Sequence, residues 1–192
     1  GKKDIFHVKR DAPNICYVTL GRPNPTAIIS PPADFTIDRT ADLSPISFGD
    51  VNGDGIKDVL FYTGTAYVVF GSTSFNTFTS TISVSDPAHV MTILGGGIGT
   101  ITSGDVDGDG FDDILLGDTK RPSGGRPGTE PGVVYVIRGS SSLPSVWDLR
   151  TRSADWMIVA EGVASLDVSF AADFTGDGKA DIGLDYRPVL VN

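Results

Sequence analysis

Three short acidic stretches of the chain share one spacing of oxygen-bearing side chains. They run over 50–58, 105–113 and 173–181, with oxygen side chains at their first, third, fifth and ninth positions and glycine at the fourth and sixth. Alternate residues of a tight loop can direct their oxygens at one point, and glycine at the sixth position permits the turn that brings the carbonyl of the seventh to the same point. Oxygen-only ligands in a flexible ring suit a hard cation, and calcium better than magnesium. The spacing therefore predicts three calcium sites.

The predicted ligands follow from this register, with the seventh residue of each loop contributing its backbone carbonyl. They are Asp50, Asn52, Asp54, Ile56 and Asp58; Asp105, Asp107, Asp109, Phe111 and Asp113; and Asp173, Thr175, Asp177, Lys179 and Asp181.

The loops differ from an EF-hand, which needs a bidentate Glu at position 12 and flanking helices. Position 12 is Phe61, Leu116 or Leu184 here, and the flanking residues have the pattern of strands. One alternative is that Asp-Gly and Asn-Gly simply form turns. Three loops in one register favour metal ligands, because a turn needs no carboxylate at the ninth position. A paired-carboxylate hydrolase is a further alternative, but the loop register already accounts for these aspartates.

The three predicted sites are expected to differ in affinity. The loop 105–113 has a carboxylate at each of the four ligand positions, whereas Asn52 and Thr175 replace one in the other loops, which also carry Lys57 and Lys179. Fewer charged oxygens and an adjacent cation weaken binding. The expected order is 105–113, then 50–58, then 173–181. Asp4 matches a loop-end position and is expected to belong to an incomplete site.

The composition limits the classes of function. The 192 residues carry a net charge of −9, which argues against nucleic acid and anionic membranes as partners. No apolar run is long enough to span a bilayer, so membrane insertion is not expected. One cysteine excludes an internal disulfide framework. The 24 glycines and 12 prolines are typical of a turn-rich β protein.

A repeated order of short apolar runs predicts the architecture. A short apolar run follows Asp4 and each of the three loops. The first three of these four runs are followed by a second strand in which a tyrosine stands four residues before a glycine (Tyr17, Tyr67 and Tyr135). A third strand is expected at 35–37, 90–94 and 157–160, and a fourth, at 46–48, 98–103 and 168–171, leads into the next loop. The predicted repeats are approximately 1–44 (partial, without its first strand), 45–97, 98–165 and 166–192 (partial). Four strands per repeat predict an all-β fold, a partial β-propeller of four-stranded antiparallel blades in one segment, 1–192.

The stretch 48–55, Phe-Gly-Asp-Val-Asn-Gly-Asp-Gly, followed by Asp58-Val59-Leu60, resembles the FG-GAP repeat of integrin α-subunit propellers and their bacterial relatives. The resemblance extends over nearly the whole chain, although Ser103-Gly104 and Ala171-Ala172 stand where that repeat has Phe-Gly. It implies a propeller that usually closes with seven blades, of which this chain supplies about three and a half. The remainder of its own propeller, or other copies of the chain, would then complete the ring.

These observations together predict a calcium-binding, non-catalytic propeller segment that is secreted or at the cell surface, since calcium sites in extracellular modules bind at roughly 10⁻⁴–10⁻³ M. Its expected work is adhesion, scaffolding or protein recognition, and the chain is expected not to be an enzyme. Three alternatives stay open: a carbohydrate-binding, lectin-like propeller, a self-assembling filament subunit, and a segment that accompanies an enzyme domain elsewhere in a longer chain. The partner is accordingly a protein or a glycan.

Two tryptophans and two histidines could be given roles. Trp147 and Trp156 could stack on sugars, but packing within the propeller is the better account. His7 and His89 have no acidic or cysteine partner at ligand spacing, so we expect them at the surface or at strand ends.

Overall fold

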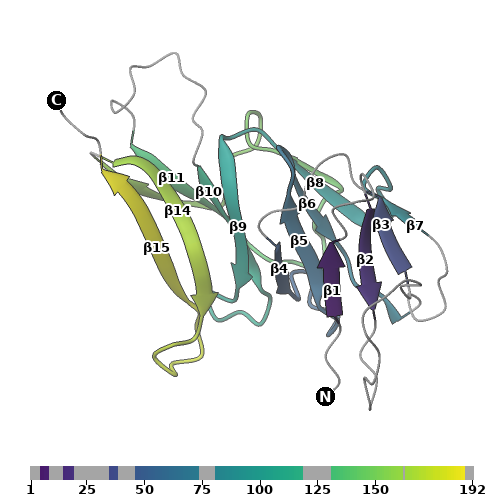
Figure 1. Ribbon diagram of the computed structural model, residues 1–192. Helices are drawn as coiled ribbons and strands as arrows, with labels where there is room; N and C mark the ends of the chain where they lie inside the picture. Colours follow the sequence, from purple (N-terminus) through teal and green to yellow (C-terminus); the bar gives the residue numbers. More distant parts are fainter. Residues whose placement is uncertain are drawn as a thin grey trace.

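The computed structural model describes residues 5–8, 15–19, 35–38, 46–73, 81–118, 131–161 and 163–188, and their regular secondary structure consists of β-strands alone (Figure 1). Asp4, expected to belong to an incomplete site, and the Gly/Pro/Arg-rich stretch 119–130 lie outside these residues. The strands are β1 (Ile5–Val8), β2 (Ile15–Thr19), β3 (Phe35–Asp38), β4 (Ile46–Gly49), β5 (Asp58–Tyr62), β6 (Ala66–Val69), β7 (Thr81–Ser83), β8 (Val90–Leu94), β9 (Ile98–Gly104), β10 (Asp113–Asp118), β11 (Gly132–Ile137), β12 (Val146–Asp148), β13 (Trp156–Ala160), β14 (Val163–Ala172) and β15 (Asp181–Pro188).

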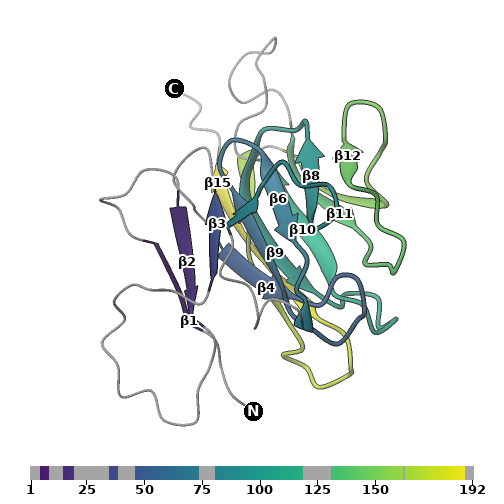
Figure 2. The same cartoon turned by 90° about the vertical axis from the view of Figure 1, so that its right-hand side faces the viewer.

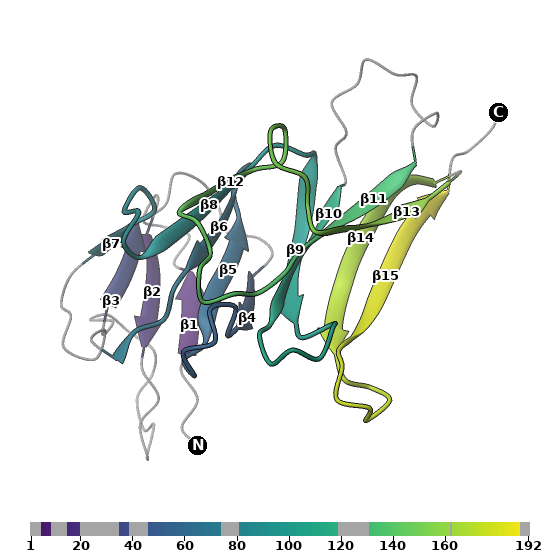
Figure 3. The same ribbon diagram turned by 180° about the vertical axis from the view of Figure 1, so that it is seen from behind.

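The strands form separate sheets that follow one another across the molecule (Figures 1 and 3). Their strand orders are β1-β2-β3-β7, β4-β5-β6-β8-β12, β9-β10-β11-β13 and β14-β15. Neighbours that are close in sequence pair antiparallel, as β9, β10 and β11 do. The all-β, blade-like class predicted from the repeats is therefore confirmed, although the described residues do not close a ring.

Two strands were missing from the sequence-based prediction. β7 and β12 lie in segments for which no strand was predicted, and they pair parallel with β3 and β8 of the preceding sheet; Figure 2 shows β12 beside β8. Each is only three residues long, too short for an alternating pattern to reveal it. β12 carries Trp147, which is 2% exposed and packs in the core, so the packing interpretation of this residue is confirmed.

The core lies between successive sheets. Ile114 and Leu116 of β10 pack with Leu60 of β5 in one cluster, whereas Leu115 packs with Leu166 of β14 in the other. Alternate side chains of a strand point to opposite faces, so β10 is covered on both sides. That double coverage explains why its sequence is a continuous apolar run, and it holds the acidic loop before β10 at the junction of two sheets.

Candidate metal centres

The three acidic loops are the connections of antiparallel strand pairs, β4–β5, β9–β10 and β14–β15. All six glycines at their fourth and sixth positions have positive φ angles, between 72° and 92°. Residues with a side chain rarely adopt this conformation, so the glycine spacing seen in the sequence is a requirement of the backbone. The loops are flanked by strands, as expected, and not by helices.

The first aspartate of each loop organises the backbone around itself. In the middle loop, Asp105 Oδ1 accepts hydrogen bonds from the amides of Gly108 (2.7 Å) and Asp109 (3.1 Å), and Oδ2 accepts one from Gly110 (2.9 Å). Asp173 accepts the same three bonds in the third loop, and Asp50 accepts two of them in the first. The loop therefore wraps around a carboxylate in each of the three repeats.

Asp105, Asp107 and Asp109 form a group that can hold a metal ion. One carboxylate oxygen of each lies within 4.8 Å of the others. The set contains only oxygen donors, which is the chemistry that hard cations require. Three carboxylates at this separation repel one another without a positive charge between them. The middle loop thus brings together three of its predicted ligands.

The ninth-position aspartates have a structural role that sequence reasoning missed. Asp58 and Asp113 are fully buried. Asp113 accepts hydrogen bonds from the amides of Val106 (3.0 Å) in its own loop and Gly139 (2.9 Å) after β11, and Asp58 is bonded in the same way to Val51 and Gly71 (2.8 Å each).

Burial raises the pKa of both carboxyl groups to about 6, although the backbone hydrogen bonds oppose this shift. Both groups stay largely ionised at neutral pH. The contact between each buried aspartate and the following strand could have been found from the sequence, because the glycine that donates its amide stands four residues after the aligned tyrosine in both repeats. Asp181, the third member, accepts hydrogen bonds from Phe174 (2.8 Å) and Thr175 (2.9 Å) within its own loop. A ligand role for these ninth-position aspartates stays a prediction.

Successive loops are joined by a repeated contact that we call the loop ladder. The amide of Asp112 donates to the carbonyl of Asp50 (2.9 Å), and the amide of Ala180 donates to the carbonyl of Asp105 (2.6 Å). These are the eighth position of one loop and the first position of the loop before it. In addition, the seventh-position side chain covers the fourth-position glycine of the preceding loop: a Cβ on Gly53 would lie 2.2 Å from Cε1 of Phe111, and one on Gly108 would lie 3.2 Å from Cγ of Lys179.

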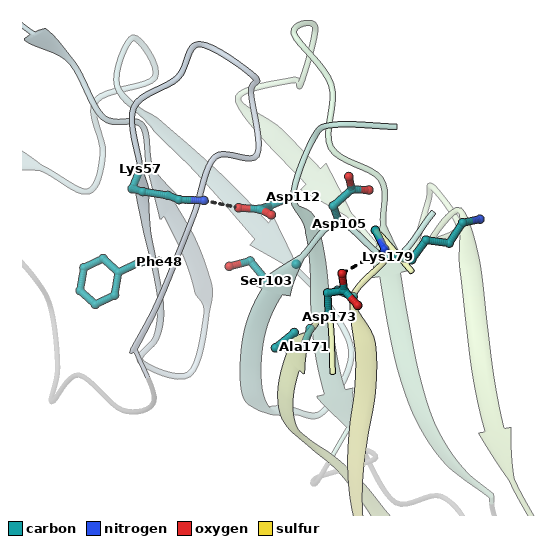
Figure 4. A pocket seen from close by; sticks show the side chains of 12 residues that line it. Phe48, Lys57, Ser103, Asp105, Asp112, Ala171, Asp173 and Lys179 are labelled. Carbon is teal, nitrogen blue, oxygen red and sulfur yellow. Dashed lines mark hydrogen bonds and ion pairs between the residues drawn. The ribbon is translucent and has the colours of Figure 1, made fainter. Parts of the chain in front are cut away.

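The two loop lysines, whose charge is expected to weaken their own sites, each contact a neighbouring loop. Lys57 Nζ pairs with the carboxylate of Asp112 (2.7 Å), which also accepts the amide of Asp50 (2.7 Å; Figure 4). The aliphatic part of Lys179 lies against Gly108. Both lysines line a hollow of about 300 Å³ at the ends of β4, β9 and β14 (Figure 4). In that hollow, Asp105 and Asp173 accept amides of their own loops.

An arginine that the sequence analysis missed lies at the middle loop. Arg138 Nε donates to Asp107 Oδ2 (2.6 Å), and its Nη2 donates to Asp109 Oδ2 (2.9 Å). The hydrogen bond that Arg138 donates to Asp107, together with the charges of both carboxylates, raises the pKa of the guanidinium above its ordinary value. Arg138 directly precedes Gly139, and Phe70 directly precedes Gly71 at the same position of the aligned repeat. This difference between the repeats was the feature of the sequence that could have drawn attention to Arg138.

The prediction for His89 was wrong in one respect. Its Nδ1 lies 2.8 Å from Oδ2 of Asp86, an acidic partner three residues earlier. The hydrogen bond from His89 lowers the pKa of Asp86. The pair lies in the turn before β8, which agrees with the expected place at a strand end.

Fold and site together define an all-β repeat protein with an acidic loop that can hold a metal ion. No family model matches the chain. It is similar to phosphatidylinositol-glycan-specific phospholipase D of Bos taurus, with 32% identity over 132 residues that cover 62% of this chain and 15% of that protein. The protein of the same name from Homo sapiens is 28% identical over 157 residues, which cover 68% of this chain and 18% of that protein. The chain thus spans less than a fifth of these curated relatives.

The comparison corrects the prediction that the chain is not an enzyme. Both relatives are named for a phospholipase activity, and a phospholipase is an enzyme. The acidic loops predicted metal binding alone, and metal binding by itself does not exclude catalysis. None of the described residues forms a helix capable of crossing a lipid bilayer.

Proposed function

We propose that the chain is a calcium-binding, FG-GAP-like propeller segment of an extracellular protein related to phosphatidylinositol-glycan-specific phospholipase D. The observation that carries the proposal is the group Asp105, Asp107 and Asp109, whose carboxylate oxygens lie within 4.8 Å of one another. The similarity to two phospholipases supports the setting, an enzyme of which this segment is a part. The segment's work is to give that protein a rigid, cation-dependent scaffold for recognition.

Calcium suits the loops better than magnesium for a geometrical reason. In the middle loop, one oxygen of Asp107 and one of Asp109 already accept amides of the loop, at 3.1 Å and 3.0 Å. The remaining ligands must come from single oxygens, a carbonyl and water at varied angles. Calcium accepts 6–8 such ligands in flexible geometry, whereas magnesium requires a near-ideal octahedron.

We expect calcium to raise the stability of the chain, because it would bind the folded loops and relieve the repulsion between their carboxylates. At a hundredfold excess over Kd, each site contributes about 2.7 kcal/mol. Thermal unfolding should therefore shift upward with millimolar calcium and return to its starting value with chelator, and magnesium should have a smaller effect. Identical unfolding curves with calcium and with chelator would reject the proposal.

Charge predicts the order of the sites, 105–113, then 50–58, then 173–181. Each of the fifth-position variants Asp54→Ala, Asp109→Ala and Asp177→Ala should lose one calcium-binding event, and isothermal titration would measure which one. The event lost in Asp109→Ala is expected to be the tightest. Loss of the tightest event in Asp177→Ala would contradict the order.

Exposed apolar side chains of β13, β14 and β15 favour further blades of the same kind as the partner. Trp156, Met157, Val159, Phe170 and Leu184 are between 40% and 58% exposed. Exposed apolar groups on sheet edges and faces promote association. We expect self-association of the isolated chain, measured as mass in solution with and without chelator. A monomer at every concentration would argue against this partner.

A further inference from the structure

We propose that Arg138 is a built-in competitor for the cation of the middle loop, so that its guanidinium must leave Asp107 and Asp109 before the ion binds. This inference rests on the proposed function. It assigns to one residue the control of affinity at one site.

The oxygens that Arg138 occupies are those a cation needs. Asp107 Oδ1 accepts the amide of Asp109 (3.1 Å), and Asp109 Oδ1 accepts the amide of Phe111 (3.0 Å). The Oδ2 atoms of both aspartates are left for an external positive charge, and Arg138 donates to both, at 2.6 Å and 2.9 Å. A divalent ion and a guanidinium at the same two oxygens would repel each other strongly. Binding is therefore an exchange of one cation for the other.

A displaced guanidinium would turn into a cavity that Arg138 already lines, and the guanidinium of Arg152 lies in the same cavity, 3.5 Å from the centre of the Trp147 ring. The backbone of Arg138 is held by a hydrogen bond from its amide to Asp155 Oδ2 (2.8 Å). Its side chain lines a cavity of about 320 Å³ together with Asp155 and Trp147. Its Cζ lies 5.7 Å from the centre of the Trp156 ring. A move away from the loop changes the surroundings of an indole, since a cation near an aromatic face interacts with its π-system.

The first loop has no such competitor among the described residues. Phe70 stands before Gly71 where Arg138 stands before Gly139. In the first loop, Asp54 Oδ2 accepts a hydrogen bond from the neutral side-chain amide of Asn52 (3.2 Å). The middle loop, which has the most carboxylates, thus also has an internal counter-charge. This counter-charge reduces the difference in calcium affinity between the middle loop and the first loop.

The test compares Arg138→Gln with the unchanged residue in a chain that carries Asp54→Asn and Asp177→Asn, so that only the middle loop keeps all its carboxylates. Isothermal titration with calcium chloride should give a Kd about fivefold lower for Arg138→Gln, the equivalent of about 1 kcal/mol for a half-exposed ion pair. Arg138→Lys, which keeps the charge but loses the two-pronged geometry, should lie between the two.

Arg150→Gln is the matched control. Arg150 pairs with Asp148 through two hydrogen bonds of 2.8 Å and touches none of the loop aspartates. It removes the same charge, so a general electrostatic effect would lower Kd equally in both variants. The fluorescence of Trp156, measured in a Trp147→Phe chain, should change on calcium addition with Arg138 present and change less in Arg138→Gln.

The outcomes separate the inference from the proposed function. Equal Kd values for Arg138→Gln and for the Arg150→Gln control would overturn the role of Arg138 while leaving calcium binding intact. Calcium binding that appears only in Arg138→Gln would support the role in its strongest form. Absence of binding in every protein, the chain with all three loops intact included, would reject both.

Discussion

Replacement of Asp113 by alanine is expected to destabilise the chain by about 3 kcal/mol or more, because each buried donor left without an acceptor costs about 1–3 kcal/mol. Asp113 is fully buried, and its two oxygens accept the amides of Val106 and Gly139. Alanine leaves both amides unpaired and opens a cavity between the loop and the end of β11. The loss is a large part of the total stability of a domain. Urea unfolding in the presence of chelator measures it without a contribution from bound metal.

Asp181→Ala is the matched control for this prediction. Asp181 holds the same loop position, but it is partly exposed and accepts amides of its own exposed loop only. Its removal should cost about 1 kcal/mol, since water can replace the lost acceptor. If Asp113→Ala lowers the free energy of unfolding no more than Asp181→Ala does, the buried hydrogen bonds between the loop and the end of β11 do not add to stability beyond an exposed loop contact.

Gly53→Ala is expected to have the second large effect, about 2–5 kcal/mol, from two additive causes. The φ angle of Gly53 is +72°, a conformation that costs a residue with a side chain about 1–2 kcal/mol. The new Cβ would also lie 2.2 Å from the ring of Phe111, and overpacking of this kind costs about 1–3 kcal/mol. Urea unfolding in chelator is again the measurement.

Gly55→Ala separates the two causes. Gly55 has a φ angle of +84°, but a Cβ there would meet nothing within 4 Å. Its substitution should therefore cost only the backbone part. Phe111→Ala should also relieve part of the cost of Gly53→Ala, so that the double variant is more stable than the sum of the single effects implies. Equal costs for Gly53→Ala and Gly55→Ala would show that the loop ladder does not constrain the loops.

The parts of the structure that repeat in the sequence could be predicted from it. The positive φ angles of Gly55 and Gly110 follow from the glycine at the sixth loop position, and β8 was predicted with its observed limits at 90–94. Repetition averages out the weakness of any single pattern, because a chance turn does not recur in the same register three times. The group of Asp105, Asp107 and Asp109 was predictable for the same reason.

The features that arise between repeats could not be predicted. β12 forms by pairing parallel with β8 of the preceding sheet, and a strand of three residues has no sequence pattern from which this pairing could be predicted. Arg138 reaches Asp107 across 31 positions, and its alignment with Phe70 showed a difference without showing its target. The phospholipase activity for which the relatives are named could not be predicted from the acidic loops, since their spacing points to a cation and not to a reaction.

The loop ladder has a consequence for how such a chain can change in evolution. The ladder joins the sheets at the end where β10 begins, whereas the connection to β11 leaves from the other end of β10, after Asp118. We therefore expect changes of length at that far end to be tolerated better than changes within the acidic loops, which carry the hydrogen bonds between neighbouring sheets.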